Sequence, residues 1–260
     1  MSAVLAPLAP MTLRQARAEF LKLWRVPAFS ATSLALPVMF YGFFGVTHAH
    51  DILPHSTTPL GLYFLASMGA YAISNVMVFS FGIGVANERG QKMDLLMRAS
   101  PLPPAAYLVA KVLNALLFGL ISLTVLIAFA RVTGSVSIGT LDSANLAARL
   151  LIGSLPFIAV GFAVGYLAGP NSAVAVVNLV YLPTAFASGI FIPVSQLPDW
   201  IAHLSPYLPL YRYVDIAWQT IGYHTGEQLA RDWADLGVAT VLFFALALWA
   251  YRRDTQRKFS

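Results

Sequence analysis

The sequence predicts an all-α integral membrane protein with six transmembrane helices. Of its 260 residues, 58% are hydrophobic and 10% are charged, and the mean hydropathy is +0.71. Soluble domains carry roughly a quarter charged residues, so this chain has too few charges to cover a surface that faces water. Its apolar residues also gather into runs of about 20, the length with which a helix crosses a bilayer.

Six apolar segments are predicted to span the membrane. They are residues 28–46, 62–86, 106–130, 149–168, 172–192 and 236–251. Pro37, Pro156 and Pro183 lie inside these segments, where membranes tolerate a kink because neighbouring groups satisfy the freed backbone atoms. The sixth segment is short and ends in LWAYRRD, an aromatic and basic boundary typical of a membrane surface.

The basic residues predict the orientation. With six spans, the side that holds both termini carries twelve of the 16 Lys and Arg residues. The positive-inside rule therefore places both termini and the 87–105 loop in the cytoplasm. This rule also explains the net charge of +5, so no nucleic-acid partner is implied. The absence of Cys excludes disulfides and thiolate metal sites, and the first ten residues lack the features of a cleaved signal peptide.

Residues 11–25 predict an amphipathic helix that lies in the cytoplasmic membrane interface. Thr12 and Gln15 fit a capping box. Apolar residues recur at helical spacing: Leu13, Ala16, Phe20, Leu23 and Trp24. Arg14, Arg17 and Lys22 lie elsewhere on the helical wheel, a pattern typical of interfacial helices. The alternative is a solvated N-terminal extension.

The segment NERGQKMDLLMRASPLPP, residues 87–104, predicts a short cytoplasmic helix between the second and third spans. Residues 91–98 are nearly all good helix formers, and Pro101 disfavours helical geometry at Ser100. Three apolar side chains share one face: Met93, Leu96 and Met97. A solvated loop would explain the charges but not this face, and an exposed apolar face indicates a protein partner.

Residues 188–224 are too rich in proline to span the membrane. Two short helices are predicted there, Leu197–Leu204 and Leu210–Ile221. The aromatic residues of the segment are typical of a membrane interface: Trp200, Tyr207, Tyr211, Tyr213 and Trp218. We expect a re-entrant or surface-lying helical hairpin on the outer side.

The predicted spans offer little chemistry. None contains Asp, Glu or His, which weighs against a proton-coupled transporter and against an intramembrane hydrolase, because both need a buried acid or base. His48 and His50 lack a third firm ligand for a metal. Neither catalytic nor metal-binding residues are therefore expected. Three glycines at four-residue spacing indicate close helix packing: Gly161, Gly165 and Gly169.

Two of the segments carry motifs that resemble the ATP-binding-cassette (ABC) transporter type-2 permease family. The first motif comprises Glu88-Arg89, Leu95-Leu96, Ser100-Pro101-Leu102 and Lys111. The second comprises Ser188-Gly189, Phe191-Ile192-Pro193, Leu197-Pro198, Trp200, Ser205, Pro209-Leu210, Tyr213 and Asp215. The resemblance covers nearly the whole chain. Residues 90–93 depart from it, since many members carry a Gly-Thr pair there.

The resemblance implies an exporter permease of a bacterial inner membrane that works as a dimer on a separate P-loop ATPase. Residues 88–100 would be the coupling helix that docks on the ATPase, and residues 11–25 the connecting helix. The coupling residues would be Glu88, Arg89, Met93, Leu96, Met97, Ser100 and Pro101. Residues 193–222 would form an outer gate, with Gly189, Pro193, Trp200, Pro209, Tyr213 and Asp215. No Walker motif is present, so ATP and Mg would be bound by the partner and no cofactor by this chain.

Two other classes of function remain open on the sequence. A stand-alone channel or facilitator would conduct without ATP. A non-transporting scaffold or sensor subunit would use the apolar cytoplasmic helix to bind a regulator. The substrate is also open, because drug, peptide, lipid and glycan exporters share this architecture.

Overall fold

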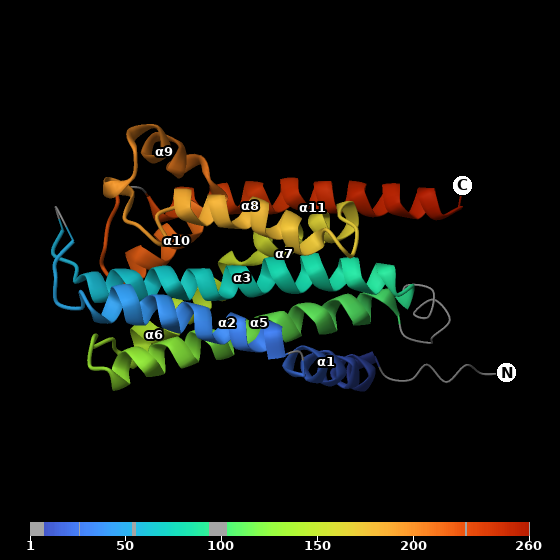
Figure 1. The fold of residues 1–260 in the computed structure, drawn as a ribbon, viewed down its shortest axis with the longest axis horizontal. Coiled ribbons are helices and arrows are strands. Elements are labelled where there is room, and N and C mark those ends of the chain that lie inside the picture. Colours follow the sequence, from blue (N-terminus) through green and yellow to red (C-terminus); the bar gives the residue numbers. More distant parts are fainter. Residues whose placement is uncertain (1–7, 26, 54–55, 94–102, 227, 260) are drawn as a thin grey trace.

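The protein is an elongated bundle of helices (Figure 1). The computed structural model describes residues 8–25, 27–53, 56–93, 103–226 and 228–259. Within these ranges the extended pairing is limited to one isolated bridge between Ile52 and Pro59. The all-helical class predicted from the sequence is therefore confirmed.

The helices follow one another along the chain with short connections. Their bounds are α1 Leu8–Trp24, α2 Pro27–Phe40, α3 Leu60–Gly90, α5 Pro104–Val132, α6 Thr140–Gly153, α7 Leu155–Leu167, α8 Ala173–Ala187, α9 Asp199–Leu204, α10 Pro209–Thr220 and α11 Leu229–Phe259. A π-helical segment, Tyr41–Val46, continues α2, and 3-10 turns at Val194–Gln196 and Ser205–Tyr207 flank α9.

Four helical segments are long and apolar enough to cross a membrane. They are Leu60–Gly90, Ala106–Val132, Thr140–Leu167 and Leu229–Asp254. The other two predicted spans, the first and the fifth, form shorter apolar helices, Ala31–Val46 and Ala173–Ala187. At 1.5 Å per residue the latter is about 22 Å long, less than the ~30 Å hydrocarbon layer. The six-span arrangement stays a prediction.

Two predicted spans begin earlier than the sequence indicated. The fourth, predicted at 149–168, starts with α6 at Thr140 and continues into α7 after a break at Ser154. The sixth, predicted at 236–251, starts at Leu229. These extensions bring Asp142, Asp232 and Asp235 into the long helices. The six predicted spans themselves hold no Asp, Glu or His, but the helices that contain the fourth and sixth spans begin earlier and carry acidic residues near their starts.

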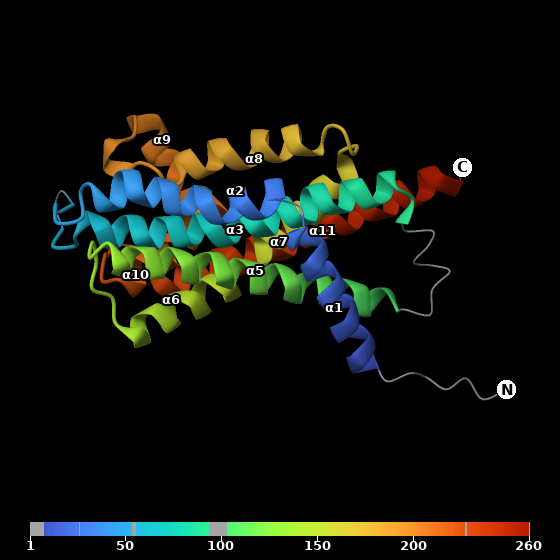
Figure 2. The ribbon, with the colours of Figure 1, turned by 60° about the horizontal axis from the view of Figure 1, so that its bottom comes forward.

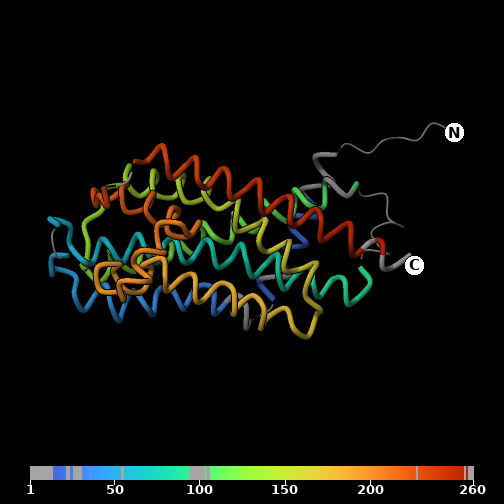
Figure 3. Tube along the Cα trace, turned by 90° about the horizontal axis from the view of Figure 1, so that it is seen from above, coloured from blue at the N-terminus to red at the C-terminus, as the bar shows by residue number. Residues whose placement is uncertain are grey.

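Helix α3 is the centre of the bundle. Of its most apolar stretch 83% is buried, against 22% for α11. It runs between α2 and α11 (Figures 1 and 3) and also packs on α5, α7, α8 and α10. The outer faces of α5 and α11 expose Leu, Val and Phe side chains, the surface expected of helices that face lipid.

Two of the three predicted packing glycines bring α7 against α3. A Cβ atom on Gly161 would lie 2.8 Å from Phe81 Cβ, and one on Gly165 would lie 2.8 Å from Val85 Cβ. Gly169 does not take part, because it lies in the exposed turn after α7. Its inclusion in the packing set was wrong, since the helix ends two residues before it.

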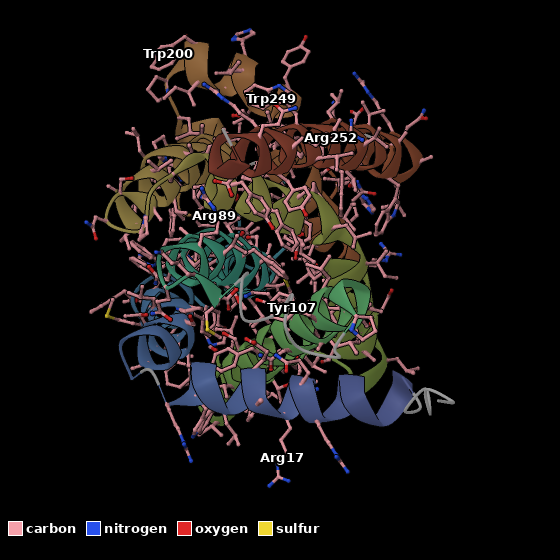
Figure 4. The ribbon with its side chains drawn as sticks, turned by 90° about the vertical axis from the view of Figure 1, so that its right-hand side faces the viewer. Arg17, Arg89, Tyr107, Trp200, Trp249 and Arg252 are labelled. Carbon is pink, nitrogen blue, oxygen red and sulfur yellow. The ribbon has the colours of Figure 1, made fainter. Side chains whose placement is uncertain are left out.

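The two ends of the bundle differ in what they hold. We name the end with α1, the last turn of α3, the first turn of α5 and the end of α11 the inner end (Figure 1). The opposite, outer end holds α9, α10 and the loop that precedes α3 (Figure 1). Helix α1 lies across the long axis of the bundle (Figures 2 and 4) and packs on α5.

Candidate functional site

The predicted coupling segment follows directly on helix α3. Helix α3 continues through Glu88 and Arg89 to Gly90, and Lys92 then adopts a left-handed backbone with φ 55°. The short helix predicted at 88–100 therefore cannot begin before the turn at 91–92. Met93 is 37% exposed. The other predicted coupling residues, Leu96, Met97, Ser100 and Pro101, lie outside the described residues.

Glu88 ties the end of α3 to the start of α5. Its carboxylate oxygens both lie 2.7 Å from Lys111 Nζ, and the Tyr107 hydroxyl also donates to it. Lys111 donates to the Tyr107 oxygen as well, at 2.9 Å. Glu88 and Lys111 are buried, so each charge depends on the other for its stability.

Arg89 ties the same turn of α3 to α7 and α11. Its guanidinium forms an ion pair with Asp254 of α11. It also donates to the carbonyl oxygens of Gly165 at 2.6 Å and Ala168 at 3.2 Å. The last carbonyls of a helix have no partner within the helix, so Arg89 caps the end of α7. Figure 4 shows Arg89 among these helices and Tyr107 beside α5.

We name Glu88, Arg89, Tyr107, Lys111 and Asp254 the inner clamp. It joins α3, α5, α7 and α11 at the point where the chain leaves α3. Glu88 and Arg89 were predicted as contacts to a partner, whereas their side chains bond within the chain. The sequence marked Lys111 as part of a motif, but nothing near Asp254 indicated a partner 165 residues away.

The predicted outer-gate residues begin with a tight turn. Gly189 has φ +81°, and a Cβ atom there would lie 2.6 Å from Val194. Its carbonyl accepts a hydrogen bond of 2.7 Å from Tyr63 of α3. Pro193 is buried behind this turn, and Pro209 starts α10. Trp200 on α9 is 71% exposed and is the most exposed of the six.

Helix α10 is a core element. Every residue from Leu210 to Trp218 is buried. The Tyr213 hydroxyl donates to the Leu150 carbonyl at 2.8 Å, and Trp218 donates to Ser67 at 2.8 Å. The two helices of the hairpin therefore differ: none of the residues of α9 is buried, whereas α10 is inserted among the long helices. How the hairpin lies relative to the membrane stays a prediction.

A buried polar group joins α10 to α11, and we name it the outer cluster. It comprises Arg212, Asp215 and Gln219 of α10, Thr225, and Asp232 and Asp235 of α11. Arg212 Nη1 lies 3.2 Å from Asp232 and its Nε lies 3.0 Å from Asp235. Gln219 Nε2 donates to both Asp215 and Asp232, at 2.9 and 2.8 Å.

Asp215 is fully buried in the outer cluster, beside the loop that holds Thr225. Its second oxygen accepts from Thr225 at 2.8 Å, and burial raises the pKa of its carboxyl. Sequence reasoning singled out Asp215 but missed Arg212, Asp232 and Asp235. The signal that could have found them is the excess of acidic residues just before the predicted sixth span.

Among the described residues, no group of three or more His, Cys, Asp or Glu side chains is placed to hold a metal ion. The buried charges at both ends join helices, which is a mechanical role.

The comparisons with known proteins agree with this arrangement. The family described as "ABC-2 family transporter protein" matches residues 51–249. The chain belongs to the ABC-2 transporter family. This ABC-2 permease is also 26% identical over 241 residues to "Putative transport permease YvfS" of Bacillus subtilis (strain 168). The similarity covers 93% of this chain and 97% of that relative. Both segments with predicted motifs fall within the matched region, so the permease is a multi-pass membrane protein of the transport class.

Proposed function

We propose that this permease is the transmembrane subunit of an ABC exporter, driven by a separate P-loop ATPase. The observation that carries the proposal is the inner clamp. It fixes the last turn of α3 to three other helices, immediately before the segment in which the sequence predicts an apolar face of Met93, Leu96 and Met97. A push on that segment would therefore act on the whole bundle.

The mechanism follows from this connection. When ATP closes the ATPase dimer, the docked segment would move as a lever, and the clamp would pass the movement to α5, α7 and α11 as one body. A second copy of the chain would supply the other half of the translocation pathway. ATP and Mg would stay on the ATPase.

The proposal includes the membrane in which the exporter lies, its orientation there and the kind of substrate it carries. We place it in a bacterial inner membrane with the inner end in the cytoplasm, as the basic residues indicate. The lipid-facing helices offer few charges along their middle, which favours an amphipathic or apolar substrate over a highly charged one.

The test is capture of the ATPase from native membranes. Tagged full-length permease is purified in mild detergent, and the co-purified proteins are identified by mass spectrometry. We expect a stoichiometric P-loop ATPase that is lost with Leu96→Asp, because a charge would disrupt an apolar docking face. The Leu96→Met variant keeps the face apolar and is the matched control.

Other outcomes would contradict the proposal. Full retention of the ATPase by Leu96→Asp would exclude docking through this face. A permease that comes out alone in several detergents, and conducts solutes in liposomes without ATP, would be a channel or facilitator. One that recruits a regulator and transports nothing would be a scaffold.

A further inference from the structure

Helix α1 turns a mixed basic and apolar face away from the bundle. Its exposed residues follow one another at helical spacing along this face: Arg14, Arg17, Leu21, Trp24 and Arg25. Figure 4 shows the Arg17 side chain pointing away from all other helices. On the side toward the bundle, Glu19 is buried and the Phe20 ring packs against Phe118 of α5 at a centroid distance of 6.3 Å. Trp24 lies at the edge of the exposed face: it is half exposed, and its ring also contacts Phe118 at 6.3 Å.

The position of α1 decides what this face can meet. Phe118 lies 14 residues after Pro104, the first residue of α5, so the contact is about 21 Å along α5 from its inner end. The ends of α3 and α11 reach further out than α1 does (Figure 1). The exposed face of α1 is therefore at the level where α2 begins, and it points sideways instead of toward the tip of the bundle.

The chemistry of the face suits charged lipid. Leu21 is 38% and Trp24 50% exposed, and both lie between arginines. Apolar side chains enter the boundary of the acyl chains, while long basic side chains reach the headgroups. Basic residues next to a membrane are attracted by anionic lipids. An ATPase would meet the tip of the bundle. Acidic residues on an ATPase are therefore not needed to explain the arginines on this face of α1.

We propose that the Arg14, Arg17 and Arg25 face of α1 binds the anionic phospholipid headgroups of the leaflet at the inner end. The bound lipids would hold α1 in the plane of the membrane and brace α5 from the side. This inference does not depend on the proposed exporter activity, because it concerns a lipid contact of the permease alone.

The experiment measures which lipids surround Trp24. Full-length permease is reconstituted in mixed vesicles of phosphatidylglycerol and phosphatidylcholine. In one preparation the phosphatidylglycerol carries brominated acyl chains, which quench tryptophan fluorescence, and in the other the phosphatidylcholine does. The Trp24 signal is obtained as the difference from a Trp24→Phe variant. We expect phosphatidylglycerol to be preferred by about fivefold, the ratio that one basic residue near an anionic surface supports. The preference should fall at high salt.

The variants separate the outcomes. In a triple variant, Arg14→Gln with Arg17→Gln and Arg25→Gln, the ratio of quenching by phosphatidylglycerol to quenching by phosphatidylcholine should fall close to one. The control triple Arg131→Gln, Arg149→Gln and Arg231→Gln removes the same net charge elsewhere and should leave it unchanged. Equal quenching by both lipids in the unaltered permease would overturn the proposal. So would a basic-face variant that keeps its lipid preference, whether or not it loses a co-purifying ATPase.

Discussion

The inner clamp and the outer cluster both bury charge between helices, but they balance it differently. In the inner clamp each charge meets one opposite charge: Glu88 meets Lys111, and Arg89 meets Asp254. In the outer cluster two carboxylates, Asp232 and Asp235, pair with the buried guanidinium of Arg212. A third carboxylate, Asp215, is held in the same cluster by Gln219 and Thr225.

The difference indicates which end of the bundle loses more stability when one of its charged side chains is removed. Removal of one partner from a balanced buried pair leaves an uncompensated charge, which is strongly destabilising. The outer cluster holds carboxylates in excess and adds neutral donors, Gln219 and Thr225. The loss of one carboxylate there also removes a repulsion. We therefore expect the inner end to be the less tolerant one.

The largest effect is expected at the inner clamp. Lys111→Met leaves Glu88 buried without its cation and should lower the free energy of unfolding by about 3–5 kcal/mol. Denaturant unfolding of the purified permease, followed by circular dichroism, measures it. The double variant with Glu88→Gln removes both charges and should recover most of the loss. A double variant as unstable as Lys111→Met would mean that packing, and not charge balance, explains the effect.

A smaller effect is expected from Asp232→Asn in the outer cluster. The asparagine keeps the shape, Arg212 retains Asp235 at 3.0 Å, and repulsion with Asp215 is relieved. The same unfolding measurement should show a loss of about 1 kcal/mol or less. Asp235→Asn, at a side chain that is 45% exposed, is the control and should cost only a few tenths. A loss for Asp232→Asn equal to that for Lys111→Met would end the contrast between the ends.

The smallest effect is the pH dependence contributed by Asp215. Because burial raises the pKa of its carboxyl, the folded permease holds this proton at pH values where the unfolded chain has released it. The free energy of unfolding should therefore decrease as the pH rises from about 4 through the raised pKa. Asp215→Asn should make the unfolding curve flatter across this range. An unchanged slope would show that Asp215 is not the titrating group.

The sequence by itself determined the class of the protein and the location of its special segments. The length and low charge of an apolar segment are local properties of the sequence, so they predicted where apolar helices form. The starts of α6 and α11 were missed because those first turns contain polar residues. The motif around Glu88 and Arg89 marked the inner end. Gly189 was marked through the family resemblance alone, and the structure supplies the physical reason: its backbone is left-handed, and a Cβ atom there would lie 2.6 Å from Val194.

Only the tertiary structure decided how the charges pair and which hairpin helix is buried. Glu88 meets a lysine 23 residues away and Arg89 an aspartate 165 residues away. Helix α10 has the aromatic composition of a surface segment, yet it lies in the core because its polar atoms find partners on α3, α6 and α11. A buried charge or hydroxyl is stable only where a partner satisfies it, and such partners are set by the packing of distant helices.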